Sequence, residues 1–465
     1  MLLCVLGISD CRKVRPGPGP SVLFVVIDTL RADRVARPDS PAAALGDWAR
    51  DAAVFTNAES AAPFTMPSMA AMMTGLYPDR TGVIAHVPGT QVKVPRGGML
   101  AETARLDGIA TGAVVANPWL SRPRSGFPRG FDVFATTRSE GLWQLRDNDA
   151  RTVTDTALSL LERWKGRRSF LWVHYFDPHM PYRPPARNAA AVGAPRGRSQ
   201  VIDDFESDHR DLTRLYSGVG YDPGELAATR RLYDGEVNYV DEQLERLLRG
   251  TAALDTGHNT ITVIVSDHGE SLGEHGLFFA HDFTVYEELT HTVLMLRGPS
   301  IPAGRHDEPV SLIDVAPTLC RLLDLRCPQG VDGRDILGGR PQRERALFAA
   351  GTPLRDKGAR FAGLQVPGID GRWSMVRRGD RKLVEIPTVS GSRFELYDLH
   401  SDPLELSDLN AGFASDAQPR ETAELRVLLQ RWHAEMSRSR PAIEEPDKAA
   451  AAEDERTLRS LGYLE

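Results

Sequence analysis

The sequence predicts a doubly wound α/β fold with a mostly parallel sheet flanked by helices, followed by a smaller C-terminal α+β domain. Two observations predict this fold class. Apolar runs without polar alternation recur along the first part of the chain, so both faces of these strands must be buried. Helical stretches separate the runs, and strands that alternate with helices at this spacing are typical of a sheet covered on both faces.

The elements of the larger domain follow each other in a regular order. The first strand, Val22–Ile27, is a continuous β-branched and apolar run, as expected of a central parallel strand. Later strands are expected at Ala110–Val115, Ser169–Tyr175, Thr260–Val265 and Thr292–Leu296. Helices are expected at Pro41–Ala52, Pro67–Thr74, Ala150–Trp164, Gly224–Arg249 and Asp314–Leu323.

The chain divides at a change of pattern after about residue 340. Short strands with turns are expected over Arg372–Ile386 and Ser392–Leu399, followed by a helix over Thr422–Ser437. We therefore predict a catalytic α/β domain over 21–340, an antiparallel sheet plus helix over 341–440 and a tail over 441–465. The polar stretch from Pro184 to about Tyr221 is predicted to be a surface insertion at the mouth of the site.

Composition and charge exclude several classes of protein. The chain has 465 residues, of which 41% are hydrophobic and 26% charged, which is ordinary for a globular protein and unlike a disordered one. It contains no apolar run of about 20 residues, which argues against an ordinary transmembrane helix. The net charge of −7 and the absence of a basic stripe argue against a nucleic-acid-binding protein.

The first 20 residues are interpreted as a possible signal segment and linker. Met1–Cys11 is a short apolar run that ends in cysteine, which is typical of a secretory or lipoprotein signal with Cys11 as the acylation site. No basic residue precedes the run, and Asp10 stands where a small residue is expected. Export to the periplasm or cell envelope, with membrane association through a lipidated Cys11, therefore stays open.

Acidic residues follow two of the predicted strands. Asp28 comes directly after the first strand, and Asp267-His268 follows the strand that begins at Thr260. Ligands of doubly wound sheets bind beyond the carboxyl ends of the strands. A single aspartate there often only caps the next turn, but two carboxylates and an imidazole together indicate a metal site of mixed oxygen and nitrogen ligands, which suits Zn²⁺ or Mn²⁺.

A threonine marks the start of the helix that contains Pro67. Because proline favours the first turn of a helix, Thr65 is expected at the N-cap or just before it. A hydroxyl at this end of the helix lies beside free amides and the positive end of the dipole, which can hold an anion. The alternative is that Thr65 caps the helix and does nothing more.

Two further segments present histidines. Asp177 and His179 lie in a proline-braced turn after the strand Ser169–Tyr175, and rigid flanking residues fix such groups in one direction. His281 follows the loop that contains Gly-Glu-His-Gly. His174 alternates within its strand, and we expect it to be packed in the core.

The sequence resembles the sulfatase family of the alkaline phosphatase superfamily over roughly residues 20–465. The segments that carry the resemblance occur in the order of the family and include nearly all the residues singled out above. They are VVIDTLRAD (25–33), TMPSMA (65–70), TGLYP (74–78), DPHMPY (177–182), LYDGEVNY (232–239), SDHGESLGEHG (266–276), DVAPT (314–318), LYDLHSDP (396–403) and LGY (461–463).

The resemblance implies a role for each matching residue. Asp28, Asp267 and His268 correspond to ligands of the main metal, and Thr65 stands at the position of the nucleophile, which also faces that metal. His179 and His281 correspond to groups that flank the anionic head of the substrate, where they protonate the leaving group or bind its oxygens. Lys382 and Asp177 are expected to contact the substrate.

Two departures from the family pattern bear on the chemistry. Sulfatases convert a cysteine or serine nucleophile to formylglycine, but Thr65 cannot become that aldehyde, and Met69 replaces the arginine of the signature. No formylglycine is therefore expected. Thr29 stands where sulfatases carry another metal-binding aspartate, and His268 replaces the common asparagine. One anionic ligand fewer disfavours Ca²⁺, which takes six or more oxygens, and favours Zn²⁺ or Mn²⁺.

These features predict a metal-dependent hydrolase or transferase of phosphate or sulfate esters that uses a threonine nucleophile, with phosphate esters favoured. The expected substrate is an anionic ester, which can be a small molecule, a glycan or a lipid headgroup. Two alternatives stay open. One is an arylsulfatase-like sulfuric ester hydrolase, and the other is a catalytically silent member of the fold that binds an anion or a glycan.

Overall fold

The computed structural model describes residues 19–441 with internal gaps, and two isolated residues of the tail. The gaps are 36, 38, 86–89, 123, 137–148, 196–198, 208–211, 255–258, 340–342, 354–370 and 414–418, and the tail residues are 452 and 456. The predicted signal segment with Cys11 and most of the predicted tail therefore lie outside the described residues. No helix in the described part of the chain is long and apolar enough to cross a membrane.

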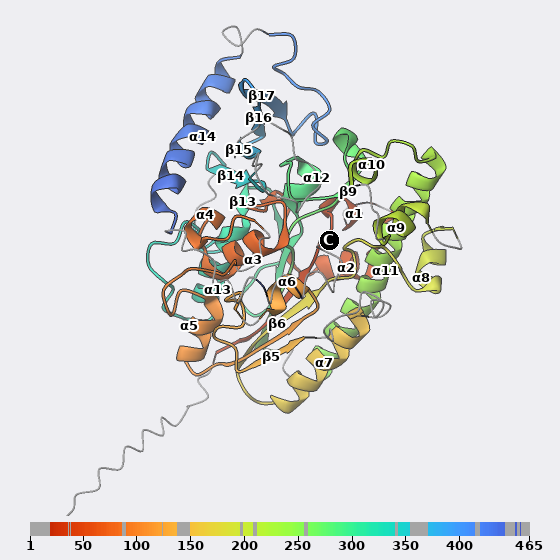
Figure 1. Ribbon diagram of the computed structural model, residues 1–465. Coiled ribbons are helices and arrows are strands. Elements are labelled where there is room, and N and C mark those ends of the chain that lie inside the picture. Colours follow the sequence, from red (N-terminus) through yellow and green to blue (C-terminus); the bar gives the residue numbers. More distant parts are fainter. Residues whose placement is uncertain are drawn as a thin grey trace, which may run out of the picture.

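An eight-stranded mixed sheet forms the centre of the molecule (Figure 1). Its middle is parallel, because β1 pairs with β6 and β7, and β4 pairs with β6 and β5. Only β11 runs antiparallel to its neighbours. The strands, in spatial order, are β12 (Gly304–His306), β2 (Ala53–Phe55), β11 (Leu294–Arg297), β7 (Thr260–Ser266), β1 (Ser21–Ile27), β6 (Ser169–Tyr175), β4 (Ala110–Val115) and β5 (Val133–Thr136).

Helices cover both faces of this sheet, as the sequence predicts (Figure 1). One face packs against a core that includes residues of α3 (Thr65–Thr74), α5 (Leu100–Leu106) and α13 (Val315–Leu322). The other face packs against α2 (Ala43–Ala49), α7 (Asp149–Arg163) and α11 (Pro223–Ala253). Strands buried on both faces explain why β1, β4, β6 and β7 read as unbroken apolar runs.

The described part of the segment 184–221 contains three short helices, and further short elements connect the main ones. The three helices are α8 (Ala186–Ala191), α9 (Gln200–Phe205) and α10 (Leu212–Ser217). The short helical connectors are α1 (Ala32–Val35), α4 (Pro78–Thr81), α6 (Pro118–Ser121), η3 (Glu274–Gly276), α12 (Glu287–Thr290) and η4 (Leu312–Asp314). The short strands are β3 (Ala58–Glu59), β8 (Ser271–Leu272), β9 (Phe278–Ala280), β10 (His291–Thr292) and β13 (Val310–Ser311).

The expected strand Thr292–Leu296 is divided between two sheets. β10 pairs with β3 in a three-stranded sheet, whereas β11 joins the central sheet beside β7. The change occurs at Val293, whose carbonyl accepts the N–H of Ser266 while its own N–H donates to the Ser266 hydroxyl. The sequence shows a single apolar run here because β10 and β11 both contribute buried residues.

A four-stranded antiparallel sheet and a long helix follow, at the top of the view in Figure 1. The sheet consists of β14 (Ala346–Ala350), β15 (Ser374–Arg378), β16 (Arg381–Thr388) and β17 (Gly391–Asp398), and the helix is α14 (Arg420–Ser439). Leu425, Leu429 and Trp432 of α14 pack in one core with Val376 of β15 and Ala71 of α3. The smaller sheet therefore shares buried contacts with the helix that covers the central sheet.

Candidate active site

Four neighbouring strands of the central sheet lead to polar side chains at one edge. In β1, β4, β6 and β7, an apolar residue near the strand end packs in the core that α3 covers, and a polar residue follows two positions later. Because side chains alternate between the two faces of a strand, these polar residues belong to the α3 face. They are Asp28, Asn117, His174 and Asp267, all buried.

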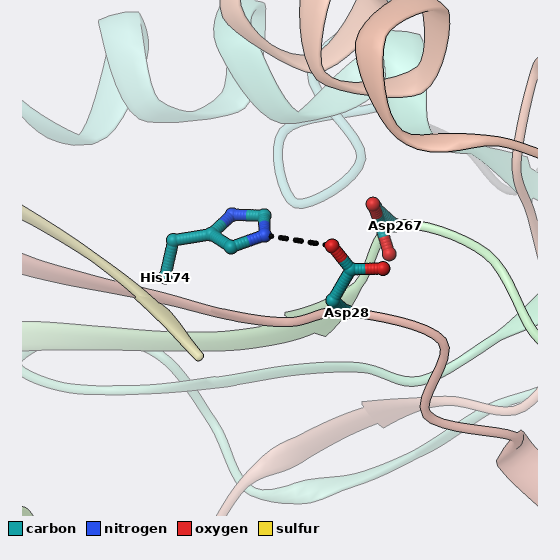
Figure 2. A group of neighbouring side chains, drawn as sticks. All are labelled: Asp28, His174 and Asp267. Atoms are coloured by element: carbon teal, nitrogen blue, oxygen red, sulfur yellow. Dashed lines mark hydrogen bonds and ion pairs between the residues drawn. The ribbon is translucent and has the colours of Figure 1, made fainter. Parts of the chain in front are cut away.

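Asp28 is held by one of its two carboxylate oxygens. Asn117 donates from Nδ2 to Oδ2 of Asp28 at 2.7 Å, and Nε2 of His174 lies 3.2 Å from the same oxygen. Figure 2 shows this contact, with the carboxylate of Asp267 close to that of Asp28. Oδ1 of Asp28 is buried and has no hydrogen-bond partner among the described residues. Burial raises the pKa of Asp28, but the hydrogen bond with His174 and the nearby imidazoles outweigh it, so the pKa lies below its usual value.

Asp267 has the same asymmetry between its two oxygens. Oδ1 accepts the backbone N–H groups of Thr29 at 3.3 Å and His268 at 2.9 Å. Oδ2 is buried without a hydrogen-bond partner in the described part of the chain. Burial and the charge of Asp28 raise the pKa of Asp267 well above its usual value, and a cation beside the two carboxylates would favour the ionised form of Asp267.

The imidazole of His268 faces both of these oxygens. Nδ1 of His268 lies 2.8 Å from the carbonyl oxygen of Gly269, so it donates there and leaves the lone pair on Nε2. Nε2 is 3.7 Å from Oδ1 of Asp28, 3.5 Å from Oδ2 of Asp267 and 3.3 Å from the Thr65 hydroxyl. Burial lowers the pKa of His268 to about 3, so the ring is neutral near pH 7 and able to bind a metal.

These donors fit a divalent metal ion. Metal–ligand bonds of about 2.0–2.2 Å in a tetrahedral site place neighbouring ligand atoms roughly 3.3 Å apart. Nε2 of His268 lies 3.3–3.7 Å from the Thr65 hydroxyl and from the two unpartnered carboxylate oxygens, close to this spacing. Ligand atoms of Asp28, His174 and Asp267 also lie within 4.8 Å of one another. The buried group can therefore hold a metal ion, and His174 belongs to it as well as the residues that the sequence indicates.

Thr65 is placed at this group by α3. Phe64 precedes the helix in an extended conformation, and Thr65 is the first helical residue, one position later than an N-cap residue would stand. Its hydroxyl is 3.5 Å from Oδ2 of Asp28, and the Ser68 hydroxyl donates to the carbonyl oxygen of Asp267 at 2.7 Å. The Thr65 hydroxyl therefore lies beside Asp28 at the positive end of the helix dipole.

His179 and His281 lie together next to His268. The rings of His179 and His281 meet edge to face with centroids 4.9 Å apart, and the His281 ring is 4.7 Å from that of His268. Nδ1 of His179 donates to the carbonyl oxygen of Met180 at 2.6 Å. Burial lowers the pKa of His281, but the carboxylates of Glu270 and Asp282 outweigh it and raise the pKa to about 10, so the ring is a cation near neutral pH.

The contacts of Lys382 and Asp177 differ from those of the other candidates. The ammonium group of Lys382 is fully buried and lies 2.7 Å from Glu287 and 3.1 Å from Glu405. Oδ1 of Asp177 accepts the N–H of Ala150 in the first turn of α7 at 3.3 Å. These contacts favour a structural role for Lys382 and a helix-capping role for Asp177. The substrate contacts that the sequence predicts for these two residues stay predictions.

Sequence reasoning missed three residues of the site. His174 is packed, as expected, but it also contacts Asp28. The sequence does not indicate a role for Asn117 or Glu270. The sequence signal for His174 and Asn117 is the alternation of side chains along a strand. Each of these residues stands two positions after a residue that faces α3. This signal becomes useful only when β6 and β4 are known to lie beside β1.

The fold and the site define the class of protein. A mixed, mostly parallel sheet with polar side chains at one edge, followed by a small antiparallel sheet, is an alkaline-phosphatase-like fold. Residues 20–325 match the sulfatase family profile. The chain belongs to the sulfatase family and is a hydrolase of that superfamily.

Individual relatives carry different activities. The choline-sulfatase of Rhizobium meliloti is 24% identical over 84% of this chain and 82% of its own. A phosphonate monoester hydrolase from Silicibacter pomeroyi superposes with a TM-score of 0.69 at 21% identity, over 90% of this chain and 96% of its own. The protein BT4656, solved with its substrate D-glucosamine-2-N,6-O-disulfate, superposes with a TM-score of 0.70 at 19% identity, over 92% and 99%. The family match makes the chain a sulfatase-family hydrolase, and its relatives differ in the ester on which they act.

Proposed function

We propose that this protein hydrolyses phosphate esters in preference to sulfate esters, with Thr65 as the nucleophile and a Zn²⁺ or Mn²⁺ ion held by Asp28, Asp267 and His268. The observation that carries the proposal is the position of the Thr65 hydroxyl, 3.3 Å from Nε2 of His268 and 3.5 Å from Oδ2 of Asp28. A bound divalent ion lowers the pKa of a neighbouring hydroxyl and neutralises charge on the oxygens of the ester.

The side chains of this chain supply the remaining steps. After the hydroxyl proton leaves to solvent, Oγ1 of Thr65 attacks phosphorus, and the bond to the leaving alcohol breaks. His179 donates the proton that the leaving oxygen needs, and the cationic ring of His281 binds an oxygen of the transferring group. Water, or an acceptor alcohol in a transfer reaction, then attacks the phospho-threonine and releases Thr65.

Charge supports phosphate over sulfate. A sulfate monoester carries one negative charge less than a phosphate monoester dianion. A site with a divalent ion, the positive end of α3 and the His281 cation therefore stabilises the phosphate ester more strongly. Threonine also cannot form the formylglycine that sulfatases use. Because the chain resembles a choline-sulfatase, a sulfuric ester hydrolase is the second candidate function. Under both candidate functions the natural substrate is an anionic ester, such as one on a glycan or a lipid headgroup.

Side-by-side kinetics test the proposal. The purified protein, loaded in turn with Zn²⁺, Mn²⁺ and Ca²⁺, is assayed with p-nitrophenyl phosphate, bis-p-nitrophenyl phosphate and p-nitrophenyl sulfate. We expect the highest kcat/KM on one of the phosphate esters with Zn²⁺ or Mn²⁺. A preference for the sulfate ester would support the second candidate. Metal binding without turnover of any ester would support a silent anion-binding protein.

A further inference from the structure

Glu270 connects the loop that follows β7 to the histidine pair. Its carboxylate is fully buried, and its two oxygens have different partners. Oε1 lies 3.0 Å from Nδ1 of His281, and Oε2 accepts the Tyr182 hydroxyl proton at 3.2 Å. Burial and the Glu270 charge raise the pKa of Tyr182 well above its usual value, so the hydroxyl remains a donor.

The main chain around Glu270 is fixed by two independent contacts. Nη1 of Arg31 donates to the carbonyl oxygen of Glu270 at 3.0 Å, and the N–H of Gly269 donates to the carbonyl oxygen of Leu289 at 2.9 Å. A Cβ atom at position 269 would lie 1.9 Å from the carbonyl oxygen of Glu288, so only glycine fits this close approach. The carboxylate of Glu270 therefore projects from a rigid segment.

The contact with Glu270 determines which ring nitrogen of His281 can face the substrate. Nδ1 faces the carboxylate of Glu270, so Nε2 lies on the other edge of the ring, where Oδ1 of Asp282 is 3.8 Å away. The ring itself lies between His268, at 4.7 Å, and His179, at 4.9 Å. A side chain that can rotate about two bonds keeps such a position only when another group holds it.

We propose that Glu270, itself held by Tyr182, is the positioning residue that orients His281 toward the transferring group of the ester. The inference rests on the proposed function, in which His281 binds an oxygen of that group. A carboxylate on one nitrogen of a histidine that acts through the other is a recurrent arrangement in catalytic and metal sites. Glu270 does not touch the substrate in this arrangement and acts only through His281.

A set of five variants tests this role in the metal-loaded full chain. They are Glu270→Ala, Glu270→Gln, Tyr182→Phe, His281→Ala and the double variant Glu270→Ala/His281→Ala. Glu270→Ala should lower kcat on the preferred ester by about 10–10²-fold, with little change in KM or bound metal. Glu270→Gln should recover part of the loss because its amide oxygen still accepts from Nδ1. Tyr182→Phe should cause a smaller loss because the Glu270–His281 contact remains.

The double variant separates positioning from a general structural role. If Glu270 acts through His281, the double variant should be no slower than His281→Ala alone. Additive losses, or kcat unchanged in Glu270→Ala, would overturn the inference. Loss of bound metal in Glu270→Ala would also overturn it, because Glu270 would then act through His268. Glu288→Gln is the matched control, since Glu288 pairs with a different histidine, His275, at 3.1 Å, and kcat should not change.

A measurement without substrate distinguishes this inference from the proposed function. In ¹H–¹⁵N NMR spectra of the histidine side chains, the Nδ1–H signal of His281, assigned with His281→Ala, should be strongly downfield in the wild type. It should move upfield in Glu270→Ala and stay near its original position in Glu270→Gln. A wild type that shows this pattern but turns over no ester would refute only the proposed function. An unchanged signal in Glu270→Ala would refute the positioning role.

Discussion

The imidazole of His174 and the carboxylate of Asp28 meet across two neighbouring parallel strands, with 3.2 Å between Nε2 and Oδ2. Both side chains are fully buried. Asn117 donates a hydrogen bond to the same oxygen, Oδ2 of Asp28. The other oxygen, Oδ1, faces His268. His174 therefore either holds Asp28 in the orientation that binds a metal or binds the metal itself.

We predict that His174→Ala lowers metal affinity by about 10–100-fold, the range seen when a residue that supports a metal ligand is removed. A competition titration with a chelator measures the effect on the purified variant. His174→Gln should lose less affinity because the amide can still donate to Asp28. His400→Ala, at an exposed position of the C-terminal unit, is the control and should bind metal like the wild type. Wild-type affinity in His174→Ala would show that the histidine only packs.

A second prediction concerns Asp267. In Asp267→Asn one oxygen still accepts the backbone N–H groups of Thr29 and His268, but the negative charge toward His268 is lost. Metal content measured by mass spectrometry should therefore fall well below one ion per chain while the protein stays folded. Asp241→Asn is a matched control, because Asp241 is also buried and accepts two backbone N–H groups, from Ala44 and Leu45. Stoichiometric metal in Asp267→Asn would remove this residue from the ligand set.

A third prediction concerns the nucleophile. Thr65→Ala should lower turnover of the preferred ester by at least about 10³-fold, because no other hydroxyl replaces the attacking oxygen. Thr65→Ser keeps the hydroxyl and should retain part of the activity. Thr74→Ala, which removes a buried hydroxyl at the other end of α3, serves as the control for helix stability. Turnover that survives in Thr65→Ala would assign the attack to another group.

The fourth prediction tests the role of Lys382. In Lys382→Met the ammonium group that faces Glu287 and Glu405 is lost, which leaves two buried carboxylates without their cation. Removing one partner of a buried ion pair typically destabilises a fold by about 3–5 kcal/mol, so the midpoint of urea unfolding should fall markedly. Metal content and KM of the folded fraction should stay near wild type. A large rise in KM with unchanged stability would instead support the substrate contact expected from the sequence.

The fifth prediction concerns pH. Burial lowers the pKa of His275, but the hydrogen bond with Glu288 and the nearby Glu405 outweigh it and raise the pKa to about 9. A group whose pKa is higher in the folded state stabilises the fold fully below its unfolded value of about 6.5. This contribution should disappear as the pH rises from about 6.5 to 9. Urea unfolding at pH 6 and pH 9 should therefore show a smaller loss of stability in His275→Gln than in the wild type. Equal losses in both proteins would contradict the assignment.

The sequence alone predicted the sheet and singled out several polar residues that the structure brings together, because those signals are local. An unbroken apolar run such as Val22–Ile27 must be buried on both faces, and the residue after it must stand at the sheet edge. The acids Asp28 and Asp267 could be found in this way. The start of α3 was also predicted to within two positions, because Pro67 marks a first helical turn.

Only the tertiary structure decided which distant side chains meet. The strand order places β6 and β4 beside β1, and this order alone brings His174 and Asn117 to Asp28. The pattern around Lys382 likewise cannot show that Glu287, 95 positions away, lies against its ammonium group. Apolar alternation reports which face of a strand is buried, but it carries no information about the neighbour that shares that face. The identity of these contacts follows from the packing of the whole chain, where burial of polar groups is stable only if they find partners.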